Sequence, residues 1–306
     1  NVVTILDGIR EIAGSAKVNY YNYGDDVRQN SMDKVNEAAA IAKKSDLAIV
    51  VVGENPLRYQ KSKTCGENID RMGLDLLGTQ NQLVQKIHET GVPTIVVLVG
   101  GRPLSVNWIA QNVQALVQAW EPGSLGGRAL ANILAGKVNP SAKLPISIPR
   151  HSGQIQMIYN HKPSQYFHKY IDGPSTPLYP FGFGLSYTRF AYSSLKLSHT
   201  RISDKDSFTA SIELTNVGDR EGTEVVQLYI RDIYSSATRP VKELKDFARV
   251  TLKPGEKKTV TFTVTPDKLA YWNRNMQYGV EKGEFEIMIG SSSQDKDLKK
   301  VKMEVL

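Results

Sequence analysis

Apolar residues recur with two different periods along this 306-residue chain, and the period changes near residue 190. In the first 150 residues, short apolar runs alternate with stretches of helical spacing. The runs at 46–53, 94–99 and 115–120 are typical of strands buried on both faces of a parallel sheet. Strands and helices joined by short links predict right-handed crossovers and a mostly parallel, doubly wound α/β sheet.

Several stretches between these runs are predicted to be helices. Ser31 is a candidate N-cap for the first amphipathic helix. A second helix is expected to begin near Thr79 and to end at Gly91, just before a proline. Shorter helices are expected around 106–110 and just before Gly136.

From about residue 190 the period becomes two, which predicts β-strands. Apolar and polar positions alternate in four segments, with turn signals between them. The alternating residues are Phe208, Ala210, Ile212 and Leu214; Val226, Leu228 and Ile230; Val260, Phe262 and Val264; and Phe285, Ile287 and Ile289. Several short strands of this kind predict a β-sandwich of the immunoglobulin or fibronectin type III type.

The composition between these two regions is different again. Residues 151–189 are rich in Tyr, Pro, Gly and His and have no sustained periodicity, and aromatics at this density favour an ordered linker. We therefore expect an α/β domain over 1–150, the linker over 151–189, and a β-sandwich domain over 190–306.

Composition and charge exclude several classes of protein. The chain carries a net charge of +7 from 38 basic and 31 acidic residues. The basic residues are scattered except at 296–302, so we expect a solvated surface and no nucleic-acid partner. No apolar run approaches the roughly 20 residues that a membrane span needs. The single Cys65 excludes an intramolecular disulfide. The first residues lack an initiator Met and a signal pattern, which suggests a fragment or a processed product.

Two carboxylates lie in a Gly/Pro-rich loop that follows the run at 46–53, and loops at the carboxyl ends of such strands often carry chemistry. A glycosidic bond breaks when a carboxylic acid protonates the departing oxygen while a second carboxylate attacks or directs water. Glu67 suits the acid role, and Asp70 and Arg71 are near enough in sequence to position it or to bind substrate. Glu54 is the alternative acid. No second carboxylate of matching role is evident.

Other candidate sites are weaker. Gly100-Gly101-Arg102 lacks the three-glycine dinucleotide fingerprint, so a tight turn is favoured over phosphate binding. Cys65 has no evident activating partner. The histidines lack Cys or acidic neighbours at metal spacing, so no metal or cofactor is expected. Trp108 and Trp120 are expected to pack rather than to bind sugar.

Several short motifs are distributed over the whole chain, and together they are highly specific. They are Gly53-Glu54; Gly66-Glu67 through Asp70-Arg71; Leu74 to Gln80; Gly101-Arg102-Pro103-Leu104; Ala119 to Gly123; Lys143-Leu144-Pro145; and Pro180 to Tyr187. With these motifs the chain resembles glycoside hydrolase family 3, the family of β-glucosidases and β-xylosidases. The resemblance covers the C-terminal half of a typical member.

The resemblance implies an (α/β)6 sandwich followed by a fibronectin type III-like domain, both preceded in the family by a TIM-type barrel. It also implies a retaining exo-acting β-glycosidase, with an Asp nucleophile on the barrel and a Glu general acid/base on the sandwich. By its position in the Gly-Glu-x-x-Asp-Arg loop, Glu67 is similar to that acid/base, and Glu54 stays open as the alternative.

This sequence contains no barrel, and the resemblance therefore implies that the nucleophile and much of the sugar pocket lie outside it. We expect the chain to fold alone without turning over substrate. The implied partners are a β-linked oligosaccharide or glycoside and the N-terminal barrel of the parent chain. A periplasmic or extracellular location follows from the same resemblance.

Two other function classes are left as alternatives. The first is a non-catalytic carbohydrate-binding or scaffolding module. The second is a nucleotide-binding α/β protein, which the missing glycine fingerprint disfavours. The β-sandwich is expected to support an enzyme by packing, because residues 190–306 show no clustered aromatic face.

Overall fold

The computed structural model describes residues 2–24, 26–54, 62–154, 156–163 and 170–306. The chain forms two compact units. Residues 1–138 and 148–155 make up the first unit, and residues 139–147 and 156–306 make up the second. The domain limits expected from the sequence, at residues 150 and 189, stay a prediction.

The first unit contains a three-stranded parallel sheet with the order β1-β2-β3. The strands are β1 (Ala48–Gly53), β2 (Thr94–Val99) and β3 (Ala115–Trp120). Two of them have the bounds that the sequence predicts, and β1 begins two residues after the start of its apolar run. Ala48 pairs with Thr94 and Ile95 with Ala115, so all three carboxyl ends meet at one edge. The predicted parallel α/β class is confirmed.

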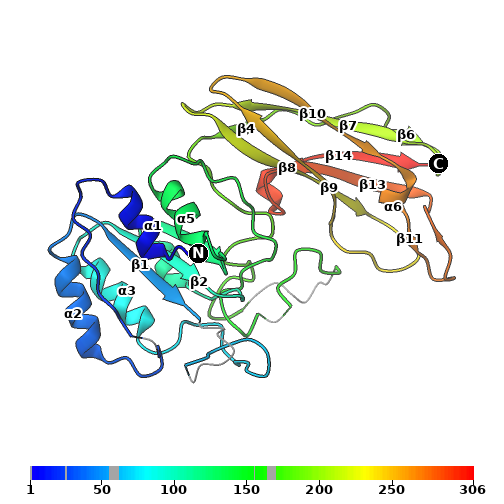
Figure 1. Ribbon diagram of the computed structural model, residues 1–306. Coiled ribbons are helices and arrows are strands. Elements are labelled where there is room, and N and C mark those ends of the chain that lie inside the picture. The colour runs from blue at the N-terminus through cyan, green and yellow to red at the C-terminus, as the bar shows by residue number, and fades with distance from the viewer. Residues whose placement is uncertain (1, 25, 55–61, 155, 164–169) are drawn as a thin grey trace. The chain divides into compact units, whose positions relative to one another are not determined.

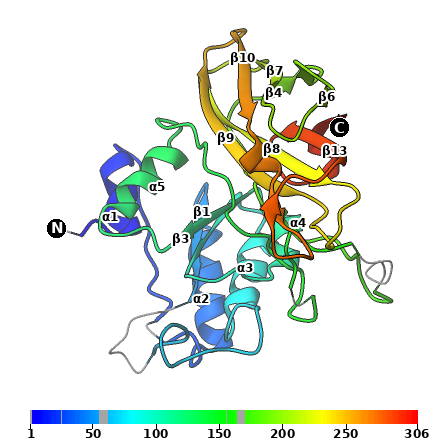
Figure 2. The same cartoon turned by 90° about the vertical axis from the view of Figure 1, so that its right-hand side faces the viewer.

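Two pairs of helices lie on opposite sides of this sheet, as Figures 1 and 2 show. Helix α1 packs on α5, and α2 packs on α3. The helices are α1 (Ile5–Ile12), α2 (Met32–Ala42), α3 (Gln80–Glu89), α4 (Asn107–Asn112) and α5 (Gly126–Leu134). Ser31 and Thr79 are the N-caps of α2 and α3, and Gly91 and Gly136 follow α3 and α5 with φ of 80° and 69°. These helix ends agree with the sequence prediction.

The burial expected for the strands is only partly right. Val96 and Val97 of the central strand β2 are fully buried. Val51 of β1 is 45% exposed, and every residue of β3 is partly exposed. Of the described strands, β1 and β3 have only one strand neighbour each, so their side chains depend on helices and loops for cover. The prediction of burial on both faces is wrong for these two.

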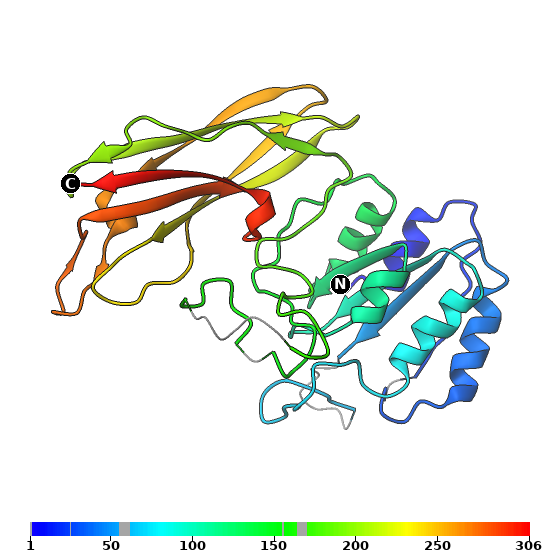
Figure 3. The same ribbon diagram turned by 180° about the vertical axis from the view of Figure 1, so that it is seen from behind.

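The second unit contains two sheets packed face to face, which Figure 3 shows from behind. One sheet consists of β4 (Phe190–Tyr192), β5 (Lys196–Leu197), β7 (Phe208–Asn216) and β10 (Lys257–Val264). The other consists of β6 (Arg201–Ile202), β14 (Leu298–Val305), β13 (Gly283–Gly290), β8 (Gly222–Asp232) and β9 (Glu243–Leu252). A one-turn helix, α6 (Pro266–Leu269), and a small hairpin, β11 (Tyr271–Trp272) with β12 (Tyr278–Gly279), complete the unit.

The core of the sandwich contains the alternating residues that the sequence singled out. Phe208, Leu228, Val264 and Ile287, for example, belong to one buried cluster with members from both sheets. Strands β9 and β14 are not among those predicted from the alternating pattern. On β14, Val301, Met303 and Val305 pack in the sandwich core, while the three lysines at 299, 300 and 302 are exposed, and Nζ of Lys302 lies 3.3 Å from Oε2 of Glu284 on β13.

Part of the aromatic segment before the sandwich packs within this same unit. The ring of Tyr159 stacks on that of Phe181 with centroids 4.2 Å apart, and its edge meets the buried Tyr229. The Gln227 side chain donates to the carbonyl oxygens of Gly182 and Ser291. The segment is therefore held by ring packing and by a buried amide.

Close packing of α1 on α5 predicts that Gly8 tolerates no side chain. A Cβ on Gly8 would lie 2.2 Å from the carbonyl oxygen of Gly127. Overpacking of this kind costs about 1–3 kcal/mol, so Gly8→Ala should lower the urea midpoint of the first unit. Gly73→Ala is the matched control in the same unit, because a Cβ there meets only a carboxylate oxygen of Asp75, at 4.0 Å. Equal midpoints for the two variants would contradict this packing.

Burial of Asp232 at the end of β8 predicts a pH-dependent stability. Desolvation raises the pKa of this carboxyl from 3.8 to about 6, although Arg239 opposes the shift. The folded state therefore disfavours the carboxylate, and the penalty is absent at low pH and grows as pH rises from about 4 to 6. Asp232→Asn should be more stable than the parent at pH 7.5 and close to it at pH 4. Urea unfolding at both pH values measures this, and a pH-independent difference would refute it.

Candidate active site

The candidate site begins at the carboxyl end of β1, where Gly53 turns the chain. Its φ is 146°, and a Cβ there would lie 1.8 Å from the carbonyl oxygen of Val99. The buried Gln80 side chain bonds both backbone groups of Gly53, accepting from its N–H at 2.7 Å and donating to its C=O at 3.0 Å. This arrangement places the next residue, Glu54, at the edge of the sheet.

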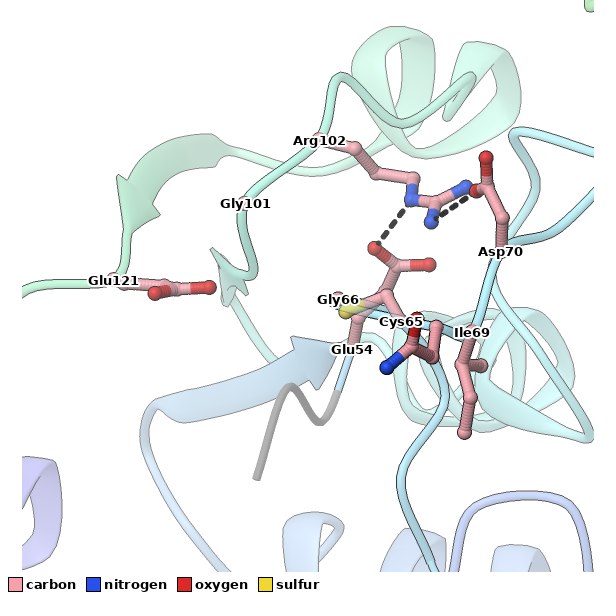
Figure 4. Close-up of a pocket in the computed structure, with 9 residues that line it drawn as sticks. Glu54, Cys65, Gly66, Ile69, Asp70, Gly101, Arg102 and Glu121 are labelled. Atoms are coloured by element: carbon pink, nitrogen blue, oxygen red, sulfur yellow. Dashed lines mark hydrogen bonds and ion pairs between the residues drawn. The ribbon is translucent and has the colours of Figure 1, made fainter. Parts of the chain in front are cut away.

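The Glu54 carboxylate is buried between Arg71 and Arg102, and Figure 4 shows its contact with Arg102. Its side chain is 1% exposed, with Oε1 2.6 Å from Nη1 of Arg71 and Oε2 2.9 Å from Nε of Arg102. Arg102 also reaches Oδ1 of Asp70 through Nη2 at 2.8 Å. The pKa of Asp70 is lowered by the backbone N–H of Arg71 and by Arg102. Together these four residues form the charge network of the site, which we call the Glu54 network.

The Glu54 network fastens the loop that carries Glu67. Arg71 binds Glu54 and also donates to the carbonyl oxygen of Asp75. Within the loop, the buried Lys63 ammonium donates to the carbonyl oxygen of Glu67, and the N–H of Ile69 donates to the carbonyl oxygen of Gly66 at 3.0 Å. The Glu67 side chain is exposed on a backbone held at both ends.

A pocket of about 610 Å³ opens beside this network. It is lined by Glu54, Cys65, Gly66, Asn68, Ile69, Asp70, Gly101, Arg102 and Glu121. Glu67 is not among the lining residues, although its neighbours Gly66 and Asn68 are. Burial, followed by the nearby Glu54 carboxylate, raises the pKa of the Cys65 thiol. Cys65 is therefore not an activated nucleophile.

The site thus brings together Glu54, Asp70 and Arg71 of the sequence prediction, with Glu67 on the same loop. Their chemical roles stay predictions. From the sequence, Arg102 is placed in a turn and in a family motif and Glu121 in a family motif, and neither is given a role in the site. Both residues follow strands whose carboxyl ends meet at the same edge, and this rule of parallel sheets was the signal that could have found them.

The described residues lack two further features. In that part of the chain, no three His, Cys, Asp or Glu side chains gather in a way that could hold a metal ion. None of the helices described there is long and apolar enough to cross a membrane.

The sequence matches two family models in the order that the fold indicates. Residues 1–187 match the glycosyl hydrolase family 3 C-terminal domain, and residues 224–293 match a fibronectin type III-like domain. The chain therefore belongs to glycosyl hydrolase family 3. The resemblance and the fold class inferred from the sequence are both confirmed.

Curated relatives and solved structures agree with this assignment. The chain is 45% identical to a β-xylosidase of Formosa agariphila over 99% of this chain and 42% of that protein. It is 41% identical to a periplasmic β-glucosidase of Salmonella typhimurium over 85% of this chain and 34% of that one. A β-glucosidase structure from Erythrobacter marinus aligns with a TM-score of 0.90 at 35% identity, covering 100% of this chain and 43% of that chain. The chain spans less than half the length of these proteins.

The burial of Glu54 predicts a large cost for removing its carboxylate. Glu54→Ala leaves the largely buried Arg71 without a carboxylate and Arg102 with only the exposed Asp70, and breaking a buried pair in this way costs about 3–5 kcal/mol. Glu89→Ala is the matched control, because Glu89 pairs with Lys86 where both side chains are about half exposed. Removing such a surface pair costs less than about 1 kcal/mol. Urea unfolding compares the two, and a Glu54→Ala cost as small as that of the control would contradict the network.

Proposed function

We propose that this chain is the C-terminal part of a retaining, exo-acting β-glycosidase and that it supplies Glu67 as the general acid/base. The observation that carries the proposal is the difference in exposure between the carboxylate in the family's Gly-Glu-x-x-Asp-Arg loop and the one at the end of β1. The Glu54 side chain is 1% exposed, whereas Glu67 is exposed on a fastened backbone between two residues that line the pocket.

The position of Glu54 argues against its role as the acid. A general acid must come within about 2.6–3.2 Å of the oxygen that it protonates. Both oxygens of Glu54 already face guanidinium nitrogens, and its side chain is 1% exposed. Glu54 would have to leave two ion pairs to reach a substrate. We therefore assign Glu54 to holding the loop and Glu67 to the proton transfer.

In this mechanism Glu67 protonates the departing glycosidic oxygen while a nucleophile attacks the anomeric carbon. The Glu67 carboxylate then takes a proton from the water that hydrolyses the covalent glycosyl-enzyme. The two carboxyl groups of a retaining enzyme lie about 5–5.5 Å apart. We propose that the nucleophile comes from an N-terminal barrel of the parent protein, so the chain alone folds without turnover.

Asp70 and Arg71 have different proposed roles in substrate binding. The Asp70 side chain is 87% exposed at the pocket, so it can accept hydrogen bonds from sugar hydroxyls while Arg102 holds one of its oxygens. The Arg71 side chain is 11% exposed and is engaged with Glu54. We propose that Asp70 contacts the sugar and that Arg71 acts through the loop.

The proposed substrates and location come from the relatives. Their names, β-xylosidase and periplasmic β-glucosidase, support a β-linked oligosaccharide or glycoside as substrate and action outside the cytoplasm. The alternative of a non-catalytic sugar-binding module is tested by titrating this chain with gluco- and xylo-oligosaccharides. Tight binding without an N-terminal barrel would favour the module.

Removing Glu67 from the full-length enzyme tests the proposed acid/base. Loss of a general acid lowers the rate about 100-fold or more on substrates with poor leaving groups. Glu67→Ala should show that loss with oligosaccharides and a much smaller one with activated aryl glycosides, because a good leaving group needs no protonation. Added azide should restore turnover and yield a glycosyl azide.

Glu89→Ala serves as the control, since Glu89 is an exposed helix residue in a surface ion pair. It should leave kcat unchanged for both substrate classes. Full activity of Glu67→Ala on oligosaccharides would remove Glu67 from the mechanism.

A further inference from the structure

The pocket has a third acidic side chain, Glu121, to which the proposed mechanism gives no role. It lines the pocket together with Asp70 and Arg102. Figure 4 shows Glu121 on one side of Glu54 and Asp70 on the other. Among the described residues no ion pair or hydrogen bond engages the Glu121 carboxylate, in contrast to those of Glu54 and Asp70.

The backbone before Glu121 is strained. Trp120 has φ of 53°, in the left-handed region that is a genuine outlier for a bulky side chain. The register between β2 and β3 also shifts here, so that Leu98 pairs with Gln118 and Val99 with Trp120, passing over Ala119. Bulges next to active sites commonly re-aim a side chain. The strain and the bulge together direct residue 121 away from the regular path of the strand.

A glycine on the neighbouring loop leaves room for the carboxylate. A Cβ on Gly101 would lie 3.1 Å from Oε1 of Glu121, which is tighter than ordinary contact. The N–H of Gly100 donates to the carbonyl oxygen of Trp120 at 3.0 Å and joins the two loops. Two independent local features therefore place one unpaired carboxylate at the pocket wall.

We propose that Glu121 determines specificity by accepting hydrogen bonds from hydroxyls of the sugar that departs. This inference rests on the proposed function, in which Glu67 protonates the oxygen of that departing sugar. An ionised carboxylate only accepts hydrogen bonds, and its two oxygens suit a pair of adjacent hydroxyls. Asp70 and Ile69, which is 42% exposed, line the same pocket and offer a second carboxylate and an apolar contact.

The test uses the full-length enzyme and compares two substrates with the same glycone. One is the β-linked disaccharide that the enzyme hydrolyses best, and the other is the corresponding nitrophenyl glycoside. A hydrogen bond to a charged group is worth about a 10-fold to 100-fold change in binding. Glu121→Ala should lower kcat/KM for the disaccharide about 10-fold or more, mainly by raising KM. For the aryl substrate, kcat/KM should change by less than about 2-fold. The loss of kcat/KM for the disaccharide should be smaller in Glu121→Gln than in Glu121→Ala, because the amide oxygen still accepts a hydrogen bond.

Two further variants separate a direct contact from a general disturbance. Gly101→Ala should push the carboxylate aside and reproduce part of the disaccharide effect, but it should add little in the Glu121→Ala background. Glu89→Gln is the surface control and should change neither substrate. Unchanged thermal midpoints for the Glu121 variants confirm that they fold.

Each outcome separates this proposal from the acid/base assignment. Equal losses on both substrates, or no loss on either, would overturn the role of Glu121. Azide rescue of Glu121→Ala would overturn it as well, since it would make Glu121 a proton donor. Failure of the Glu67 test, with the disaccharide effect of Glu121 intact, would remove only the assignment of Glu67.

Discussion

The buried Glu54 carboxylate, held between two guanidinium groups, is the interaction on which the candidate site depends. Isolated charges are costly to bury, and three charged side chains at one sheet edge persist only because each compensates another. The pairing fastens the loop around Arg71 to the end of β1 and to the turn that carries Arg102. Exposed residues on that loop, Glu67 among them, thereby gain a defined position without being buried themselves.

Glycines make this concentration of charge possible. At the carboxyl end of β1, Gly53 lets the backbone lie against the Val99 carbonyl, and Gly100, with φ of 146°, lets the next turn pass close to the Glu54 side chain. A Cβ would lie 1.8 Å from that carbonyl oxygen at Gly53 and 3.2 Å from the Glu54 Cβ at Gly100, and both glycines have a φ that other residues rarely adopt. The family motifs around these glycines therefore have a steric reason, which is separate from the chemistry of the charged residues beside them.

The second unit reaches stability in a different way, through a continuous apolar core between two antiparallel sheets. Some of its buried polar groups are held by specific contacts, such as the Gln227 amide on the Gly182 carbonyl. Aromatic rings of the preceding segment pack on the outside of this structure at Tyr229. The supporting role that the sequence suggests for this unit stays a prediction.

The sequence by itself determined what depends on local spacing. Apolar periodicity located β2 and β3, the ends of α3, and the strands through Phe208 and Ile287, because period and punctuation are properties of neighbouring residues. The motifs, taken together, determined the family. Tertiary structure decided the features that depend on contacts between segments distant in the sequence. These are the exposure of Val51, the strands β9 and β14, the two arginine partners of Glu54, and the place of Glu121. Spacing along a chain cannot specify which loops meet at a sheet edge, and that meeting decides whether a carboxylate is paired or left available to a ligand.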